Sequence, residues 1–322
     1  MLILFFVLVG ILFCFLLALT VAFSRSRPST AVADEPVSLV VCAHDEEQNL
    51  RALIPLLRQQ RHPEFELIIV NDRSNDNTFD LLREAAAEDA RIKVVTIDRI
   101  PDHLDPKKYA VTLGIRTARY ERIVLTDADC RPASTQWLQH MTAGLHDGKQ
   151  IVLGYSPYIK EEGLLNGFIR FETLFSALQY IGFAIMGMPY MGVGRNLAYT
   201  KPLFMDNKGF NSFRKITGGD DDLFVNRHAT SKNVSLCIGK EALVYSFPKK
   251  SWRAFFRQKK RHLSVGRYYK TRDKLVLGLF MFSYIGTLYL GIGLVIANPH
   301  AYAVWACLAA RVILLVLSLQ HP

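Results

Sequence analysis

The sequence predicts an α/β protein with a Rossmann-like, mostly parallel sheet, helices on both of its faces, and transmembrane helices. Between residues 37 and 130, short runs rich in Val, Ile and Leu alternate with segments whose apolar residues recur at helical spacing. This alternation is typical of parallel βαβ units. Long apolar segments without acidic residues lie near both ends of the 322-residue chain, and such segments can cross a bilayer.

The first of these segments, residues 2–23, contains no charged side chain and predicts a transmembrane helix over 1–23. A cleaved signal peptide is the alternative. Against it, no basic region precedes the apolar run, the run is long for a signal peptide, and Arg25 and Arg27 follow it.

Near the other end, residues 275–297 and 301–319 flank a three-residue loop and predict a transmembrane hairpin over 275–319. Arg311 interrupts the second segment. A charge at that depth is costly, so Arg311 either packs inside a bundle or weakens the assignment.

The middle of the chain is predicted to be one domain, residues 37–265, preceded by a linker at 24–36. Lys and Arg crowd both of its membrane ends, and the positive-inside rule therefore places the domain in the cytoplasm. The five cysteines show no CxxC spacing, which suits a reducing compartment and argues against a disulfide framework or a zinc site.

The elements of this domain follow one another at short spacing. Strands are predicted at 37–43, 65–72, 92–97 and 121–130, and helices at 44–60, 79–90 and 106–118, with Pro55 a mild objection to the first helix. Ligands of such sheets bind at the carboxyl ends of the strands. Asp72, Asp127 and Asp129 are all predicted to lie at such ends.

Beyond residue 155 the pattern changes to long apolar stretches broken by glycines. We expect interfacial helices near 161–190 and 250–274, with a fourth span as the alternative for the first of them. Segment 249–274 holds eleven Lys or Arg, one acid and several aromatic residues. This composition occurs in nucleic-acid sites, but directly before a membrane span it favours contact with membrane lipids or phosphates, so no nucleic-acid partner is expected.

Two acids one residue apart, Asp127 and Asp129, directly follow an apolar run. A surface turn is the plain interpretation. A divalent-cation site is the other, because Asp-x-Asp at a strand end can place one carboxylate on a hard cation and leave the other for a ligand bound to it.

Seven motifs occur in the order found in glycosyltransferase family 2 enzymes with the GT-A fold, and together they resemble that family over residues 37–265. They are VVCAHDEEQNL (40–50), VNDRSNDNT (70–78), PKKYAVTLGI (106–115), TDADC (126–130), GVGRNLAY (192–199), TGGDDDLF (217–224) and RQKKRH (257–262). The pattern is similar to the membrane-bound branch that includes cellulose, chitin and hyaluronan synthases and many bacterial transferases.

The resemblance implies a nucleotide-sugar donor and a divalent cation, Mn or Mg, because the diphosphate leaving group needs charge stabilisation. It implies that Asp129 contacts the metal and that Asp127 contacts the donor sugar or ribose. Asp72, with Glu46 or Glu47, would contact the nucleobase or ribose, although acids also favour a helix's first turn. Lys107 or Lys108 would border the donor phosphates.

For the acceptor half, the resemblance implies a catalytic base in TGGDDDLF, either Asp220 or Asp221, with a slight preference for Asp221. A second cation site is the alternative for this acidic cluster. Gln258 and Arg261 match the QxxRW motif near the diphosphate, but His262 replaces its Trp, which puts processive chain extension in doubt. Gly192, Gly194 and Asn196 would shape a loop near donor or acceptor.

The sequence therefore predicts a membrane-anchored, inverting glycosyltransferase that acts on a membrane-associated glycan or lipid at the cytoplasmic face, in a bacterial inner membrane. Two rivals are a nucleotidyltransferase, which would carry a Gly-rich loop after the first strand, and a degenerate transferase-like membrane protein without activity, which would not need to keep all these acids.

Overall fold

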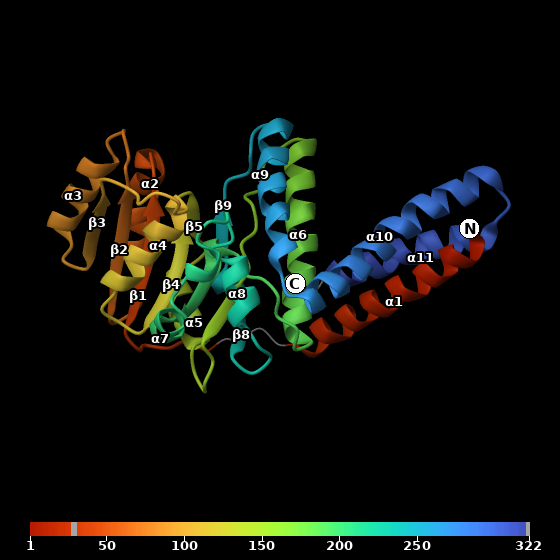
Figure 1. The fold of residues 1–322 in the computed structure, drawn as a ribbon, viewed down its shortest axis with the longest axis horizontal. Helices are drawn as coiled ribbons and strands as arrows, with labels where there is room; N and C mark the ends of the chain where they lie inside the picture. The colour runs from red at the N-terminus through yellow and green to blue at the C-terminus, as the bar shows by residue number, and fades with distance from the viewer. Residues whose placement is uncertain (27–30, 320–322) are drawn as a thin grey trace.

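The computed structural model describes residues 1–26 and 31–319, so residues 27–30 of the predicted linker lie outside the described residues. The described chain forms an α/β domain around a seven-stranded sheet and, at one side of it, a bundle of three long helices (Figure 1). The predicted fold class is confirmed.

Four parallel strands make up the first half of the sheet, in the order β3-β2-β1-β4. The apolar β-branched residues of the two central strands, β1 and β2, are buried, as expected of strands covered on both faces. The strands are β1 (Val37–Ala43), β2 (Phe65–Asp72), β3 (Ile92–Ile97) and β4 (Arg122–Asp127), and the connecting helices are α2 (Glu47–Arg58), α3 (Thr78–Glu88) and α4 (Pro106–Thr117).

The sheet continues through β7 (Leu197–Thr200), β6 (Ile151–Gly154) and β8 (Val234–Cys237). β7 pairs antiparallel with β4 and β6, whereas β6 and β8 are parallel, so one strand runs against the other six. A second sheet pairs β5 (Cys130–Pro132) with β9 (Val244–Ser246). Because β5 follows β4 after a two-residue turn, Asp129 lies in a sharp corner between the two sheets.

Helices cover both faces of the sheet. The core on one face contains Leu53 of α2, Leu82 of α3 and Trp137 of α5 (Trp137–Ala143). The core on the other face contains Val111 of α4 and Phe204 of α7 (Lys201–Asp206). This second core also includes residues of α6 and of the long helices described next.

Two helices, α6 (Leu164–Ile185) and α9 (Trp252–Val265), stand side by side between the sheet and the bundle (Figure 1). Phe168 of α6 meets Phe255 of α9 with 5.7 Å between ring centroids, and Lys259 forms an ion pair with Glu172. Only three of the described helices are long and apolar enough to span a membrane, and α6 is not among them. The alternative of a fourth span is therefore not supported.

The three candidate spanning helices are α1 (Leu2–Arg25), α10 (Thr271–Ala297) and α11 (Tyr302–Leu319). Glycines allow them to approach closely, since a Cβ on Gly286 would lie 2.8 Å from a methyl of Leu8. The Arg311 guanidinium donates to the Tyr284 carbonyl at 3.2 Å and lies over its ring, and Arg311 is 7% exposed. Of the two expectations for this residue, packing inside the bundle is the one observed.

Hydrogen bonds join the bundle to the α/β domain at the first turn of α10. The Asn226 amide of α8 (Asp222–His228) donates to the Asp273 carboxylate at 2.8 Å and accepts from the Lys270 backbone N–H at 2.9 Å. The Tyr269 hydroxyl donates to the Asp222 carboxylate at 2.9 Å. The first residues of α10 are therefore fixed to the helix that follows the acidic motif.

Candidate active site

A cleft of about 630 Å³ opens between the carboxyl end of β4 and the α6/α9 pair. One side is polar and contains the carboxylates of Asp127, Asp129 and the acidic motif 220–222. The other side is formed by α6 and α9 and includes aromatic rings, among them Phe168, Phe255 and Phe256. The cleft therefore presents a charged half with the acids and, opposite it, a half in which aromatic rings lie beside Lys259 and Arg261.

The corner after β4 gathers possible metal ligands. One ligand atom each from Asp127, Asp129 and Cys130 lie within 4.8 Å of one another. Burial raises the pKa of the Cys130 thiol, which therefore stays protonated. The two carboxylates remain as hard oxygen donors, and this set fits Mg²⁺ or Mn²⁺ better than a thiophilic metal.

Lys107 connects the two acidic motifs. Its ammonium lies 2.9 Å from Asp127 Oδ1 and 3.5 Å from Asp220 Oδ2. Enclosure in the cleft works against its charge, but Asp127, Asp220 and Asp221 outweigh this and raise the pKa of Lys107. For Asp127, burial likewise opposes ionisation, but Lys107 outweighs it and lowers the pKa. Asp127 and Lys107 therefore form a charged pair at the centre of the cleft.

Lys108 does not share this position. It is 2% exposed, and its ammonium donates to the backbone carbonyls of Ile216 and Gly218. Successive residues of α4 point in different directions, so only one of the two lysines can face the cleft. The expectation that Lys108 borders the donor phosphates is wrong for this structure, where Lys108 instead holds the segment that leads into the acidic motif.

The three acids of that motif differ in what they contact. The Asp221 carboxylate accepts from the Gly194 and Asp222 backbone N–H groups, both at 2.8 Å, and so caps α8. Burial and the neighbouring Asp221 raise the pKa of Asp222 well above its usual range. Burial, opposed by Lys107 and aided by Asp221, raises the pKa of Asp220. Asp220 accepts no side-chain hydrogen bond besides its contact with Lys107 among the described residues. Asp221 is thus held by two backbone donors, whereas Asp220 faces Lys107.

Asp72 ends β2, Glu46 directly precedes α2, and Glu47 is the first residue of α2. None of the three lines the cleft. Asp72 is paired with Arg73 at 2.8 Å, and Glu47 with Arg51 at 2.8 Å. Glu46 is half-buried, and this burial, opposed by its bond from Asn49 and aided by Asp129, raises its pKa. Their predicted contacts with a nucleobase or ribose stay predictions.

The α9 residues Gln258, Arg261 and His262 all line the cleft. His262 is exposed at the surface of the cleft, and the surrounding protein atoms, together with Lys259 and Arg261, lower its pKa to about 4. The imidazole is therefore neutral at pH 7. These three side chains face the acids of the charged half across the cleft.

Gly194 and Asn196 form the loop before β7. Gly194 donates to Asp221, and a Cβ there would lie 3.3 Å from the Asp221 side chain. Asn196 is fully buried, accepts from the Trp137 indole at 3.0 Å, and donates to the Tyr155 and Ala242 carbonyls at 2.8 Å. With its amide fully used, Asn196 supports the loop from within, in agreement with the expectation that it shapes this loop. That the loop lies near the donor or acceptor stays a prediction.

One cleft residue was missed from the sequence. Arg195 lies between Gly194 and Asn196 and lines the cleft, with its guanidinium 4.7 Å from the centre of the Tyr158 ring. The available sequence signal was its residue type, because Arg is common where carboxylates or phosphates are bound through paired hydrogen bonds.

Comparisons with known proteins agree with this geometry. The family description Glycosyl transferase family 2 matches residues 38–201. The chain is 33% identical over 129 residues to the uncharacterized glycosyltransferase YkcC of Bacillus subtilis, covering 39% of this chain and 38% of that protein. It is 25% identical over 242 residues to the probable glycosyltransferase YdaM of the same species, covering 72% and 55%. The chain thus spans about half, or less, of these relatives.

Among solved structures, the fold resembles that of the mannosyltransferase PcManGT from Pyrobaculum calidifontis, solved in complex with GDP-Man and Mn²⁺. The TM-score is 0.64 at 17% sequence identity, with 95% of this chain and 86% of that chain covered. At this identity the likeness establishes the fold.

Proposed function

Since the chain belongs to glycosyltransferase family 2, as the resemblance of its motifs predicts, we propose that it is a membrane-anchored, inverting, metal-dependent glycosyltransferase. It would take a sugar from a nucleotide-diphosphate donor to a lipid-linked or polysaccharide acceptor at the cytoplasmic membrane face, in a bacterial inner membrane. The observation that carries this proposal is the single cleft that holds Asp127, Asp129, Lys107 and Asp220 together.

In this proposal the donor diphosphate lies at the Asp-x-Asp corner. Asp129 would hold Mn²⁺ or Mg²⁺, which would neutralise charge that develops on the leaving diphosphate. Asp127 would bind the donor sugar or ribose, and Lys107, together with Gln258 and Arg261 across the cleft, would face the phosphates. Support for the donor type comes from PcManGT, whose structure contains GDP-Man and Mn²⁺.

Asp220 would act as the general base. Its carboxylate would accept the proton of the acceptor hydroxyl while that oxygen forms a bond to the anomeric carbon. The bond from this carbon to the diphosphate oxygen would break on the opposite side, the electron pair would leave with the nucleotide, and the configuration would invert. A raised pKa suits a base because it increases proton affinity.

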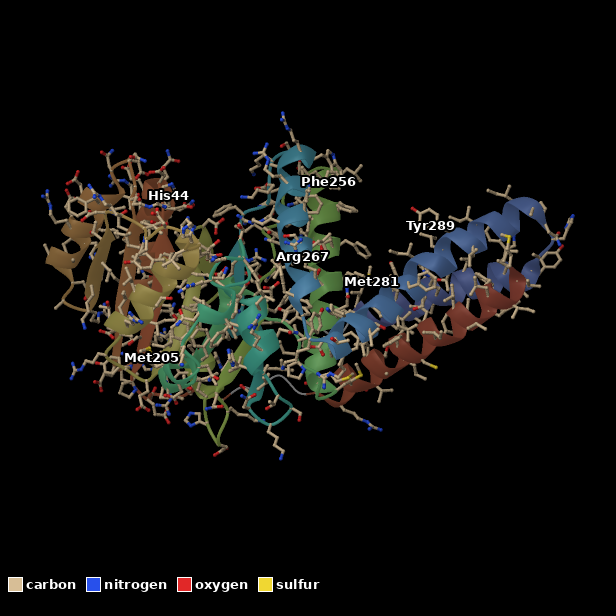
Figure 2. All side chains as sticks on the ribbon, in the orientation of Figure 1. His44, Met205, Phe256, Arg267, Met281 and Tyr289 are labelled. Atoms are coloured by element: carbon tan, nitrogen blue, oxygen red, sulfur yellow. The ribbon has the colours of Figure 1, made fainter. Side chains whose placement is uncertain are left out.

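The membrane part of the proposal rests on the helices beside the cleft. α1, α10 and α11 would span the membrane, and α6 and α9 would lie along its surface. Exposed apolar side chains on this pair include Leu164 (83% exposed), Phe256 (58%) and Leu263 (77%). In Figure 2, Phe256 is labelled on the α6/α9 pair.

The first test is nucleotide release from a panel of UDP-, GDP- and dTDP-sugars with Mn²⁺ or Mg²⁺ in detergent. We expect release from one donor in the wild type, its loss in Asp129→Asn, and its retention in Asp206→Asn, a matched change of an exposed acid at the end of α7. If no donor is turned over even with lipid extract added, or if Asp129→Asn is as active as the wild type, the proposal is wrong.

A further inference from the structure

The corner that carries Asp129 is held from behind by the side chain of Arg131, the middle residue of β5. The Arg131 Nη1 donates to the carbonyl of Ala128 at 3.3 Å and to the carbonyl of Cys130 at 2.7 Å. These two residues directly precede and follow Asp129. One guanidinium nitrogen therefore joins the backbone on both sides of Asp129 and restricts the two-residue turn from which its carboxylate projects.

Two further contacts connect Arg131 to neighbouring parts of the domain. Its Nη2 donates to the side-chain carbonyl of Asn49, in the first turn of α2, at 3.3 Å. The ring of Phe247, in the segment between β9 and α9, lies against the guanidinium, with 5.2 Å from Cζ to the ring centre. Arg131 thus fixes the corner relative to the start of α2 and to the segment that leads into α9.

Arg131 does not line the cleft, whereas Asp129 does. The Asp129 carboxylate has little direct support of its own: among the described residues, the only group that donates to it is the Cys130 thiol, at 3.7 Å. A divalent cation needs its oxygen ligands at set distances and directions. A carboxylate without firm hydrogen bonds takes its position from its backbone, and that backbone is what Arg131 holds.

We propose that Arg131 is a positioning residue for the metal site, because its hydrogen bonds to the corner set the position of Asp129 and thereby the affinity for Mn²⁺ or Mg²⁺. This inference rests on the proposed metal-dependent transferase function and deepens it by assigning a residue that acts through Asp129. Groups that orient a metal ligand from behind typically change metal affinity or activity by about 10- to 100-fold.

The charge of Arg131 alone leads to the opposite expectation. Arg131 is near enough to Asp129 for the two charges to interact. If charge were all that mattered, removal of this cation would reduce repulsion and make Mn²⁺ bind more tightly. Loss of the hydrogen bonds that hold the corner should make Mn²⁺ bind more weakly. The sign of the change in affinity therefore separates the two roles.

The test is a titration of the protein in detergent with Mn²⁺, alone and with GDP or UDP, in which electron paramagnetic resonance measures free Mn²⁺ without any turnover. The variants are Arg131→Met, Arg131→Lys and Asp129→Asn. Arg83→Met is the matched control, since the side chain of Arg83 in α3 is 69% exposed. Lys keeps the charge and the stem, but its single ammonium cannot replace a planar fork that bonds in two directions. Arg131→Lys therefore tests the inference even if Arg131→Met does not fold.

We expect Arg131→Met to raise the Kd for Mn²⁺ by about 10- to 100-fold and Arg131→Lys to raise it by a smaller factor. Asp129→Asn should lose Mn²⁺ binding, and Arg83→Met should bind as the wild type does. Thermal unfolding is measured on the same samples, because a purely structural role would lower the unfolding temperature and leave the Kd of the folded protein unchanged.

An unchanged or lower Kd in the folded Arg131 variants, with Mn²⁺ binding still lost in Asp129→Asn, would overturn the inference and leave the proposed function standing. Absence of Mn²⁺ binding by the wild type under all three conditions, or unchanged binding in Asp129→Asn, would refute the metal dependence of the proposed function and this inference with it. The two failures are therefore distinguishable.

Discussion

Asp220 and Asp221 are adjacent in the sequence but should respond differently to amide substitution. In Asp220→Asn the proposed base is lost, and general-base catalysis contributes about 10²- to 10⁴-fold, or about 3–5 kcal/mol of transition-state stabilisation. In Asp221→Asn one of two 2.8 Å bonds from backbone N–H groups is lost, because the amide keeps one acceptor oxygen. A hydrogen bond to a charged group contributes about 1.5–3 kcal/mol, so that variant should unfold about 3–10 °C lower.

Asp220→Asn should leave stability nearly unchanged. It removes a buried carboxylate that lies near Asp221, and it loses an ion pair with Lys107, whose side chain is 44% exposed. Such a partly exposed pair contributes at most about 1 kcal/mol. Metal-dependent nucleotide release with acceptor present and thermal unfolding in detergent measure the two effects on the same samples. The opposite pattern, with activity retained in Asp220→Asn and abolished in an undisturbed Asp221→Asn, would refute the assignment of the base.

Three further predictions follow from the same contacts. Nucleotide release should fall as pH is lowered through a midpoint above about 3.9, the ordinary pKa of Asp, because the raised pKa of Asp220 makes protonation of the base easier. For the same reason, the stability that protonated Asp220 contributes is present at low pH and is lost as pH rises through its folded-state pKa. A wild-type pH profile without this acidic limb would count against Asp220. Lys108→Met should lower the free energy of unfolding by about 2–4 kcal/mol, since two carbonyls lose their charged donor. Lys107→Met should abolish nucleotide release with little change in the free energy of unfolding. Equal thermal stability of the two variants would contradict this. Asn196→Ala should cost about 3–5 kcal/mol by leaving the Trp137 indole and two buried carbonyls unpaired, and a well-folded but inactive variant would show instead that the amide binds a ligand.

The sequence was sufficient for elements whose local pattern decides the structure. Strands β1, β2 and β3 have the predicted bounds because their apolar runs are short and β-branched, and those of β1 and β2 are buried on both faces. The reversal of β7 could not be predicted, because Leu197–Thr200 has the same apolar character whichever direction it runs. Direction is set by its pairing with β4 and β6, which are distant in sequence.

For the site residues, too, the sequence was sufficient only where the local pattern decides the position. The Asp-x-Asp corner could be predicted because it follows a strand directly, but the choices between Lys107 and Lys108 and between Asp220 and Asp221 depend on the rotation of a helix and on a loop bond to Gly194. Asn196 was expected to shape the loop, but the sequence could not name the three distant groups to which its amide is hydrogen-bonded. Arg195 was not predicted, because the loop was interpreted from the backbone freedom of its glycines and not from its charged side chain.

The hydrogen bonds from Asn226 and Asp222 to the start of α10 limit which fragments and sample conditions can preserve the acidic motif. A fragment that ends before Tyr269 would lose the hydroxyl that meets Asp222, the Lys270 N–H and the Asp273 carboxylate together. The motif that contains Asp220 would then lack the support on its carboxyl-terminal side. Removing α10 and α11 to obtain a soluble fragment is therefore a poor route to an active sample. Lipid or detergent conditions that distort the first turn of α10 should lower catalytic activity even where they do not contact the cleft.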